Sequence, residues 1–345
     1  MYRRTFTRTL AFASLATVLA VTTGCGDDSD PGTENAGGAQ PLENITYLTS
    51  FGTFGRDAYA YVAKEKGYFA DAGFNVDIKP GAGTGDNIKI ITSGQAQFTP
   101  IDLTGGLLVM GGGQAKDFTA VAGIQQRTMA AIISLEGNGI STPKDLEGRK
   151  LADLPGSVVR NLFPTYAKLA NVDYKKVTWV NGTPQTLMGT LASGQVDGIG
   201  QFVVGKPTVE FIAKGKKAVV LPYSDYLQDL YGNTLITSKA YAQQNPEKVK
   251  KFTAALLKGL EYAIANPAEA GQILKKAVPT AVPESAAAEL TLMAPFVRPE
   301  AAGVPVGALD SQRVARSIAT LQGSGQVEAG LTPEQVIKFD LVPKA

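Results

Sequence analysis

A seven-residue phrase occurs twice in this chain, one hundred positions apart: residues 91–97 read ITSGQAQ and residues 191–197 read LASGQVD. The similarity continues upstream, where GAGT at 81–84 stands in the place of NGTP at 181–184. Around both copies, an alternating apolar stretch, a Gly- or Pro-containing turn, helical spacing and a second apolar run follow one another. The pattern predicts a βαβ unit made twice, in an α/β fold with two sheets. The alternative is that Ser-Gly-Gln is a common helix-ending turn used twice by chance.

The first 41 residues read as export and tethering sequence. Residues 1–24 carry three arginines before an apolar run, which is typical of a signal peptide. Small residues precede Cys25 as in a bacterial lipobox, so we expect Cys25 to be lipidated. An ordinary signal peptide or an uncleaved anchor is the alternative, and both the twin-arginine and the Sec route stay open. Residues 25–41 are acidic and Gly-rich, which predicts a flexible tether from the lipid.

Composition excludes several function classes. The chain has no histidine and one cysteine, which rules out His-based triads, His-coordinated metals and an intramolecular disulfide. Without the signal-peptide arginines, 30 basic side chains face 31 acidic ones, and they are scattered, so no nucleic-acid partner is predicted. The Gly-rich stretches match neither a phosphate loop nor a dinucleotide fingerprint. We therefore expect no catalytic residue, no metal and no cofactor.

About 300 residues remain from Leu42 onward, enough for two lobes with separate cores. Helical spacing predicts one helix from Ala58 to Phe69, and apolar runs at 129–135 and 234–237 are expected to carry the chain between lobes. From Pro246 onward the pattern is mainly helical and is expected to brace the first lobe, with a third independent domain as the alternative. The predicted lobes are residues 42–130 with 236–345, and residues 131–235.

The predicted ligand site is the cleft between the lobes. Parallel sheets bind ligands at the carboxyl ends of their strands, where helix N-termini add amide donors. Asp102 ends a strand and opens a helix, so it either caps that helix or contacts ligand. The repeat sets Phe202 opposite it, with core packing as the alternative for this ring. The candidate ligand-binding residues are Phe51, Phe54, Arg56, Asp57, Thr84, Asp102, Thr104, Ser157, Val158, Asn161, Gln201 and Phe202.

Two ligand chemistries stay open from these residues. Aromatic, amide and carboxylate groups such as Phe202, Gln201 and Asp102 suit a planar polar ligand. Arg56 and the backbone amides at the helix start near Ser157 instead suit a small anion. An adjacent Arg-Asp pair is also a common feature of solvated surfaces.

Three stretches carry a family resemblance: residues 61–76 (YVAKEKGYFADAGFNV), 94–102 (GQAQFTPID) and 141–150 (STPKDLEGRK). In them the chain resembles the solute-binding lipoproteins of bacterial ABC importers, in the family for nitrate, sulfonates, taurine and thiamin-pyrimidine precursors. The resemblance covers about Ile45 to the C-terminus. It implies a two-lobed periplasmic-binding-protein-like fold of type II, which closes on a small molecule by hinge motion and presents it to a membrane permease.

The resemblance also implies a role. We expect a monomeric, non-catalytic binding protein, exported and held by the Cys25 lipid at the outer face of the cell membrane. Its expected solute is a planar heteroaromatic molecule such as a thiamin-pyrimidine precursor, because family members for these solutes stack the ring on aromatic side chains. A small anion such as an alkanesulfonate, taurine or nitrate is the alternative.

Two other classes are weighed against this role. One is an enzyme like the eukaryotic branch that makes the thiamin pyrimidine, which resembles a protein with a histidine and a cysteine-rich iron site; this chain has neither. The other is a structural or adhesive surface protein, which would not need two matched lobes around a cleft.

Overall fold

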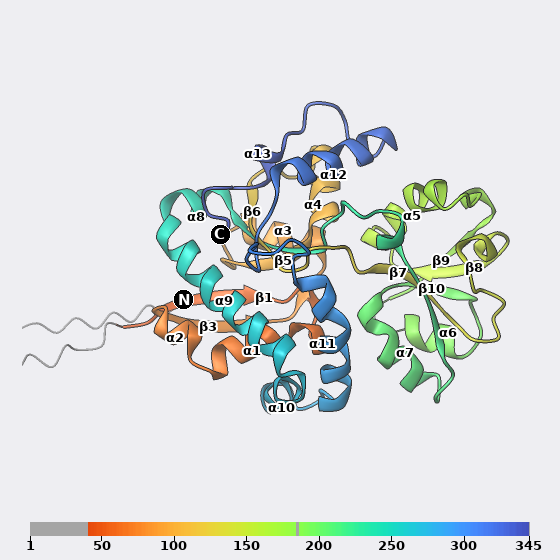
Figure 1. The fold of residues 1–345 in the computed structure, drawn as a ribbon, viewed down its shortest axis with the longest axis horizontal. Helices are drawn as coiled ribbons and strands as arrows, with labels where there is room; N and C mark the ends of the chain where they lie inside the picture. Colours follow the sequence, from red (N-terminus) through yellow and green to blue (C-terminus); the bar gives the residue numbers. More distant parts are fainter. Residues whose placement is uncertain (1–40, 184–185, 345) are drawn as a thin grey trace, which may run out of the picture. The chain divides into compact units, whose positions relative to one another are not determined.

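The computed structural model describes residues 41–183 and 186–344 (Figure 1). The predicted signal peptide, the lipidation at Cys25 and nearly all of the predicted tether lie outside the described residues. Within the described ranges, no helix combines the length and the apolar character that a membrane crossing requires.

The first sheet takes strands from distant parts of the chain. It contains β1 (Glu43–Leu48), β3 (Phe74–Lys79), β5 (Thr99–Asp102), β6 (Phe118–Gly123) and β12 (Asn233–Ser238). Strand β1 pairs in parallel with β3, and β12 lies antiparallel between β5 and β6. A parallel bridge between Tyr47 and Phe98 joins these two groups. The connected order is therefore β3-β1-β5-β12-β6.

The strands of the second sheet all come from one stretch of the chain, residues 130–222. It contains β7 (Ala130–Leu135), β8 (Lys150–Asp153), β9 (Thr178–Asn181), β10 (Gly198–Phe202) and β11 (Ala218–Pro222). Its order is β9-β8-β10-β7-β11, in which β8 is parallel to β9 and β10, and β7 is antiparallel to β10 and β11. This succession of strand directions is the same as in the first sheet. The two copies of the repeated phrase therefore precede equivalent strands, β5 and β10.

The chain passes between the sheets twice. Residues 124–129 connect β6 to β7, and residues 223–232 connect β11 to β12. The runs expected to cross, 129–135 and 234–237, are instead almost entirely paired strands of the two sheets, because each finds partners on both sides.

The helices cover both sheets. In the second sheet, α5, α6 and α7 surround the strands (Figure 1). In the first, the helix expected from Ala58 to Phe69 is two helices, because Gly67 adopts a left-handed conformation with φ 76° that ends the first one. The helices up to residue 245 are α1 (Ala58–Glu65), α2 (Tyr68–Asp71), α3 (Thr84–Thr92), α4 (Leu103–Gly111), α5 (Val158–Leu169), α6 (Leu187–Ala192), α7 (Lys206–Ile212) and α8 (Lys239–Gln244).

The C-terminal part is helical, as expected. Helix α9 (Pro246–Ala265) packs against α1 through the predicted apolar stripe, and the Phe252 ring stacks on Phe98 at 4.0 Å between centroids. Helix α11 (Pro283–Val297) reaches further: it contacts α7 and the short 3-10 helices η1 (Gly55–Asp57) and η4 (Val203–Gly205). The remaining helices are α10 (Pro267–Ala277), α12 (Ser311–Gly323) and α13 (Pro333–Val336).

Candidate ligand-binding site

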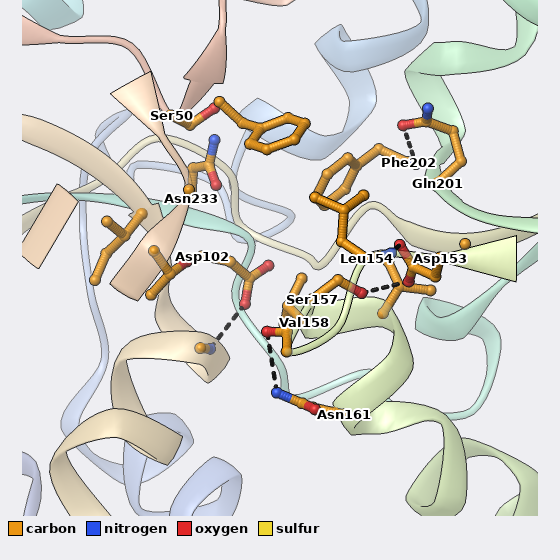
Figure 2. Close-up of a pocket in the computed structure, with 18 of the residues that line it drawn as sticks. Ser50, Asp102, Asp153, Leu154, Ser157, Val158, Asn161, Gln201, Phe202 and Asn233 are labelled. Atoms are coloured by element: carbon orange, nitrogen blue, oxygen red, sulfur yellow. Dashed lines mark hydrogen bonds between the residues drawn. The ribbon is translucent and has the colours of Figure 1, made fainter. Parts of the chain in front are cut away.

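A pocket of about 450 Å³ lies where strands of the two sheets end (Figure 2). The ends of β5, β8 and β10, the start of β12 and the first residues of α3 and α5 contribute to its wall. All but two of the residues predicted to bind ligand line it. They are Phe51, Phe54, Arg56, Thr84, Asp102, Ser157, Val158, Asn161, Gln201 and Phe202.

The two exceptions, Asp57 and Thr104, lie behind the wall. The Asp57 carboxylate accepts the backbone N–H of Phe54 at 3.0 Å and that of Ser50, and burial raises its pKa to about 6. Thr104 is 1% exposed in the first turn of α4, and its N–H donates to Asp102. Neither residue therefore lines the pocket, because each is buried among the residues behind its wall.

Asp102 both caps a helix and faces the pocket. One oxygen, Oδ1, accepts the backbone N–H groups of Thr104 at 2.9 Å and Gly105 at 3.3 Å, because β5 ends in an extended conformation directly before α4. Figure 2 shows the carboxylate directed into the pocket. Burial raises the pKa of Asp102 to about 6, although the two amide hydrogen bonds oppose this shift. The two roles left open by the sequence are compatible in one side chain.

A second buried carboxylate, Asp153, was missed by the sequence analysis. It ends β8, is 2% exposed, and accepts the backbone N–H of Leu154 at 2.7 Å and the Ser157 hydroxyl. Burial raises its pKa to about 6. Gly200 on β10 makes room for it, since a Cβ there would lie 2.1 Å from Asp153 Oδ2. The rule that singled out Asp102, a strand end before a helix, would also have found Asp153.

Arg56 is buried and surrounded by aromatic and acidic groups. Its guanidinium carbon lies 4.6 Å from the Phe54 ring centroid and 5.4 Å from that of Phe202. Its backbone N–H donates to Glu289 Oε2 at 3.1 Å, and its positive charge lowers the otherwise raised pKa values of Asp57 and Glu289. The charge of Arg56 therefore already interacts with two nearby carboxylates. Glu289 on α11 lines the pocket and has no local sequence signal.

The hydrogen-bonding side chains at the start of α5 are also engaged within the protein. Ser157 caps the helix by accepting the backbone N–H of Arg160 at 3.0 Å, while its own hydroxyl donates to Asp153. The Asn161 side chain turns back and donates to the Gly156 carbonyl at 3.2 Å (Figure 2). A carboxylate thus lies beside the positive end of this helix dipole, where an anionic ligand would otherwise be stabilised.

The wall opposite Asp102 is mostly apolar. Phe202 extends from the end of β10, with Leu154 beside it (Figure 2), and Met188 from α6 also lines the pocket. Gln201 Oε1 accepts the backbone N–H of Phe202 at 2.8 Å, which holds the strand end. An aromatic ring and aliphatic groups therefore oppose a carboxylate.

Further polar residues line the pocket that the sequence analysis did not select. Ser50 follows β1, Gln125 lies in the segment that leaves β6, and Asn233 begins β12. Asn233 lies at the same edge as the strand ends because β12 is antiparallel to β5, a relation that no local pattern reveals. In residues 41–183 and 186–344, no group of three or more acidic or cysteine side chains is gathered as a metal site requires.

Several known proteins are similar in sequence. The formylaminopyrimidine-binding protein of Halalkalibacterium halodurans is 25% identical, covering 70% of this chain and 73% of its own length. The riboflavin-binding protein RibY of Chloroflexus aurantiacus is 26% identical, covering 88% of each chain. A 4-amino-5-hydroxymethyl-2-methylpyrimidine phosphate synthase of Aspergillus parasiticus is 26% identical over 66% of this chain and 69% of its own.

Solved structures show the same fold. The periplasmic aliphatic sulphonate binding protein SsuA from Escherichia coli matches with a TM-score of 0.68, covering 87% of this chain and 98% of its own, at 15% identity. The periplasmic-binding-protein-like α/β fold expected from the sequence is therefore confirmed. A family described as NMT1/THI5 like matches residues 57–270, more than half of the sequence, and the chain belongs to this family.

Proposed function

We propose that the protein is the extracytoplasmic solute-binding component of an ABC import system, which captures a small planar heteroaromatic solute in this pocket and delivers it to a permease. The observation that carries the proposal is the placement of the Phe202 ring opposite the buried Asp102 carboxylate. A flat solute ring packs against the Phe202 ring, and hydrogen-bond donors on the solute's edge donate to the Asp102 carboxylate. The names of two relatives support this class, because formylaminopyrimidine and riboflavin are both planar nitrogen heterocycles.

The charges of the pocket favour such a solute over an anion. Among the described residues that line the pocket, Arg56 is the only basic one, and the nearby carboxylates of Asp57 and Glu289 offset its charge. Asp102 and Asp153 are buried carboxylates that line the pocket at the ends of β5 and β8. A sulfonate, taurine or nitrate would meet like charge at both carboxylates, which are buried and therefore weakly screened. Small anions are the alternative solute class, and the thermal-shift panel described below tests them.

Other parts of the proposal concern the whole protein. We propose that it is non-catalytic, although one relative is a synthase, because the absence of histidine and the single cysteine leave few groups for such chemistry. Lipid anchoring through Cys25 at the outer face of the cell membrane, a monomeric state and the lobe limits 42–130 with 236–345 and 131–235 belong to the same proposal. The pocket draws on both sheets, which suits closure on ligand by hinge motion.

A thermal-shift panel on residues 41–345, which form one compact unit, tests the solute class. The panel holds aminopyrimidines and flavins beside taurine, alkanesulfonates and nitrate. A ligand at 100 times its Kd adds about 2.7 kcal/mol to the free energy of unfolding, which raises the Tm by several degrees. We expect a shift with a heterocycle and none with the anions. A shift with an anion alone would contradict the proposed solute class.

A further inference from the structure

Asp102 and Asn233 form a pair on one wall of the pocket. They are direct partners in the antiparallel register of β5 and β12, and the Leu103 N–H donates to the Gly232 carbonyl at 3.0 Å beside them. Directly opposed residues of antiparallel strands project to the same face of a sheet. Figure 2 shows both side chains on the wall that faces Phe202.

The two side chains offer complementary hydrogen-bonding groups. An ionised Asp102 only accepts, and both amide bonds from α4 end on its Oδ1, which leaves acceptor capacity on Oδ2. The Asn233 side-chain amide makes no hydrogen bond with any residue that the structure describes, so both its N–H donors and its oxygen are available. An acceptor and a donor are therefore carried by directly opposed positions of β5 and β12.

The backbone of Asn233 is held in place, so the pair has a defined geometry. Its N–H donates to Gln125 Oε1 at 2.8 Å, and Gln125 is itself 2% exposed. The preceding residue must be small, because a Cβ on Gly232 would lie 2.6 Å from Gln125 Oε1 and 2.8 Å from the Arg127 carbonyl oxygen. Rigid support of this kind is what selective recognition requires.

We propose that Asp102 and Asn233 together recognise one edge of the solute, on which a hydrogen-bond donor and an acceptor occupy adjacent positions. Asp102 accepts from a ring N–H or an exocyclic amino group, and Asn233 donates to the neighbouring ring nitrogen or carbonyl oxygen. The ligand class is a planar nitrogen heterocycle with an amidine or lactam edge, its face against Phe202. The inference rests on the proposed function, and it assigns Asn233 as a specificity-determining residue.

This arrangement penalises solutes that lack the edge. A ring without a donor leaves the remaining acceptor capacity of the buried Asp102 carboxylate unsatisfied after water is displaced from the pocket, and this costs more than the hydrogen bond itself gains. Sites built on buried polar groups can reject analogues without the matching group by factors of about 10⁴–10⁵. We expect at least about a 100-fold loss when the donor is blocked by methylation.

Calorimetric titration of residues 41–345 with matched ligand pairs tests the proposal. One pair is 4-amino-5-hydroxymethyl-2-methylpyrimidine and its 4-dimethylamino analogue; the other is riboflavin and its 3-methyl analogue. Methylation removes the donor and keeps the ring face. We expect the parent of at least one pair to bind and its methylated analogue to bind at least 100-fold more weakly.

A variant pair tests the role of Asn233 directly. Asn233→Asp keeps the size and replaces the donor by a second acceptor beside Asp102, so the parent ligand should bind about 100-fold more weakly. Asn75→Asp is the matched control, because Asn75 is exposed on β3 and outside the pocket; its Kd should be unchanged. If Asn233→Asp does not fold, as judged by circular dichroism, the methylated ligands on the unchanged protein still decide the question.

The outcomes separate this inference from the function on which it rests. Equal affinity for parent and methylated analogue overturns the edge recognition and leaves the heterocyclic solute class standing. An unchanged Kd in a folded Asn233→Asp protein overturns the assignment of Asn233. Failure of both parents to bind overturns the edge recognition together with the proposed solute class.

Discussion

The two copies of the repeat lead into equivalent strands and differ in how those strands end. Strand β5 ends in Asp102, whose carboxylate caps the nine-residue helix α4. Strand β10 ends in Phe202, which precedes η4 without a side-chain cap and presents a ring to the pocket. The backbone thus places two residues at matching positions, and their side chains supply the polar and the apolar wall. Topology determines where the site lies, and the strand ends determine its chemistry.

The two strands also differ two residues before these ends. Position 100 is a proline on β5, whereas position 200 is a glycine on β10, beneath the Asp153 carboxylate. The second sheet therefore holds a buried carboxylate that depends on a missing side chain in the neighbouring strand. The following predictions test these differences.

Gly200→Ala should have the largest effect. Its Cβ would overlap Asp153 Oδ2 at 2.1 Å, so either the carboxylate or β10 must move, and we expect a loss of about 3 kcal/mol in the free energy of unfolding. Denaturant titration measures it. Gly189→Ala on α6 is the control: nothing lies within 4 Å of its Cβ, and it should be neutral or stabilise by up to about 1 kcal/mol. Equal free energies of unfolding for the two variants would show that the Asp153 carboxylate can move aside without loss of stability.

Phe202→Leu should weaken ligand binding with less effect on stability. Loss of ring stacking should cost about 2 kcal/mol of binding free energy, or roughly a 30-fold increase in Kd, for whichever heterocycle the protein binds. Phe211→Leu is the matched control, since Phe211 is 80% exposed on α7 and does not line the pocket. A common Kd for both variants would mean that Phe202 is a packing residue only.

Asp102→Asn should have an effect that depends on pH and falls to the smallest of the three at pH 4. Burial raises the pKa of Asp102 from 3.8 to about 6, so its contribution to stability is present below pH 4 and lost as the pH rises through 6. Asparagine stays neutral and still caps the helix. We expect the variant to be more stable than the unchanged protein by roughly 2–3 kcal/mol at pH 8 and by little at pH 4.

The same comparison of stability at pH 4 and pH 8 separates the contribution of Asp102 from those of the other pocket carboxylates whose pKa values are raised. Asp57, Asp153 and Glu289 are present in both proteins, so their titration cancels in the difference. A stability difference that is constant between pH 4 and pH 8 would contradict the raised pKa of Asp102.

Much of the site could be predicted because it follows from local patterns. The offset of one hundred residues placed Asp102 and Phe202 at equivalent strand ends, and helix-start signals placed Ser157 beside them. Asp57 was placed in the right loop, but its side chain turns to the amides of Ser50 and Phe54. The direction of a side chain depends on which donors surround it, and these come from the folded loop.

The sequence by itself determined the α/β class, the repeated strand-helix-strand unit and the sheet edge at which the candidate pocket lies, because periodicity and turn chemistry are local. Only the tertiary structure placed Asn233 opposite Asp102, set Asp153 over Gly200 and paired the Arg56 loop with Glu289 on α11. These neighbours lie between 47 and 233 positions apart in sequence. Strand register and burial bring them together, and they also raise the pKa values of the carboxylates.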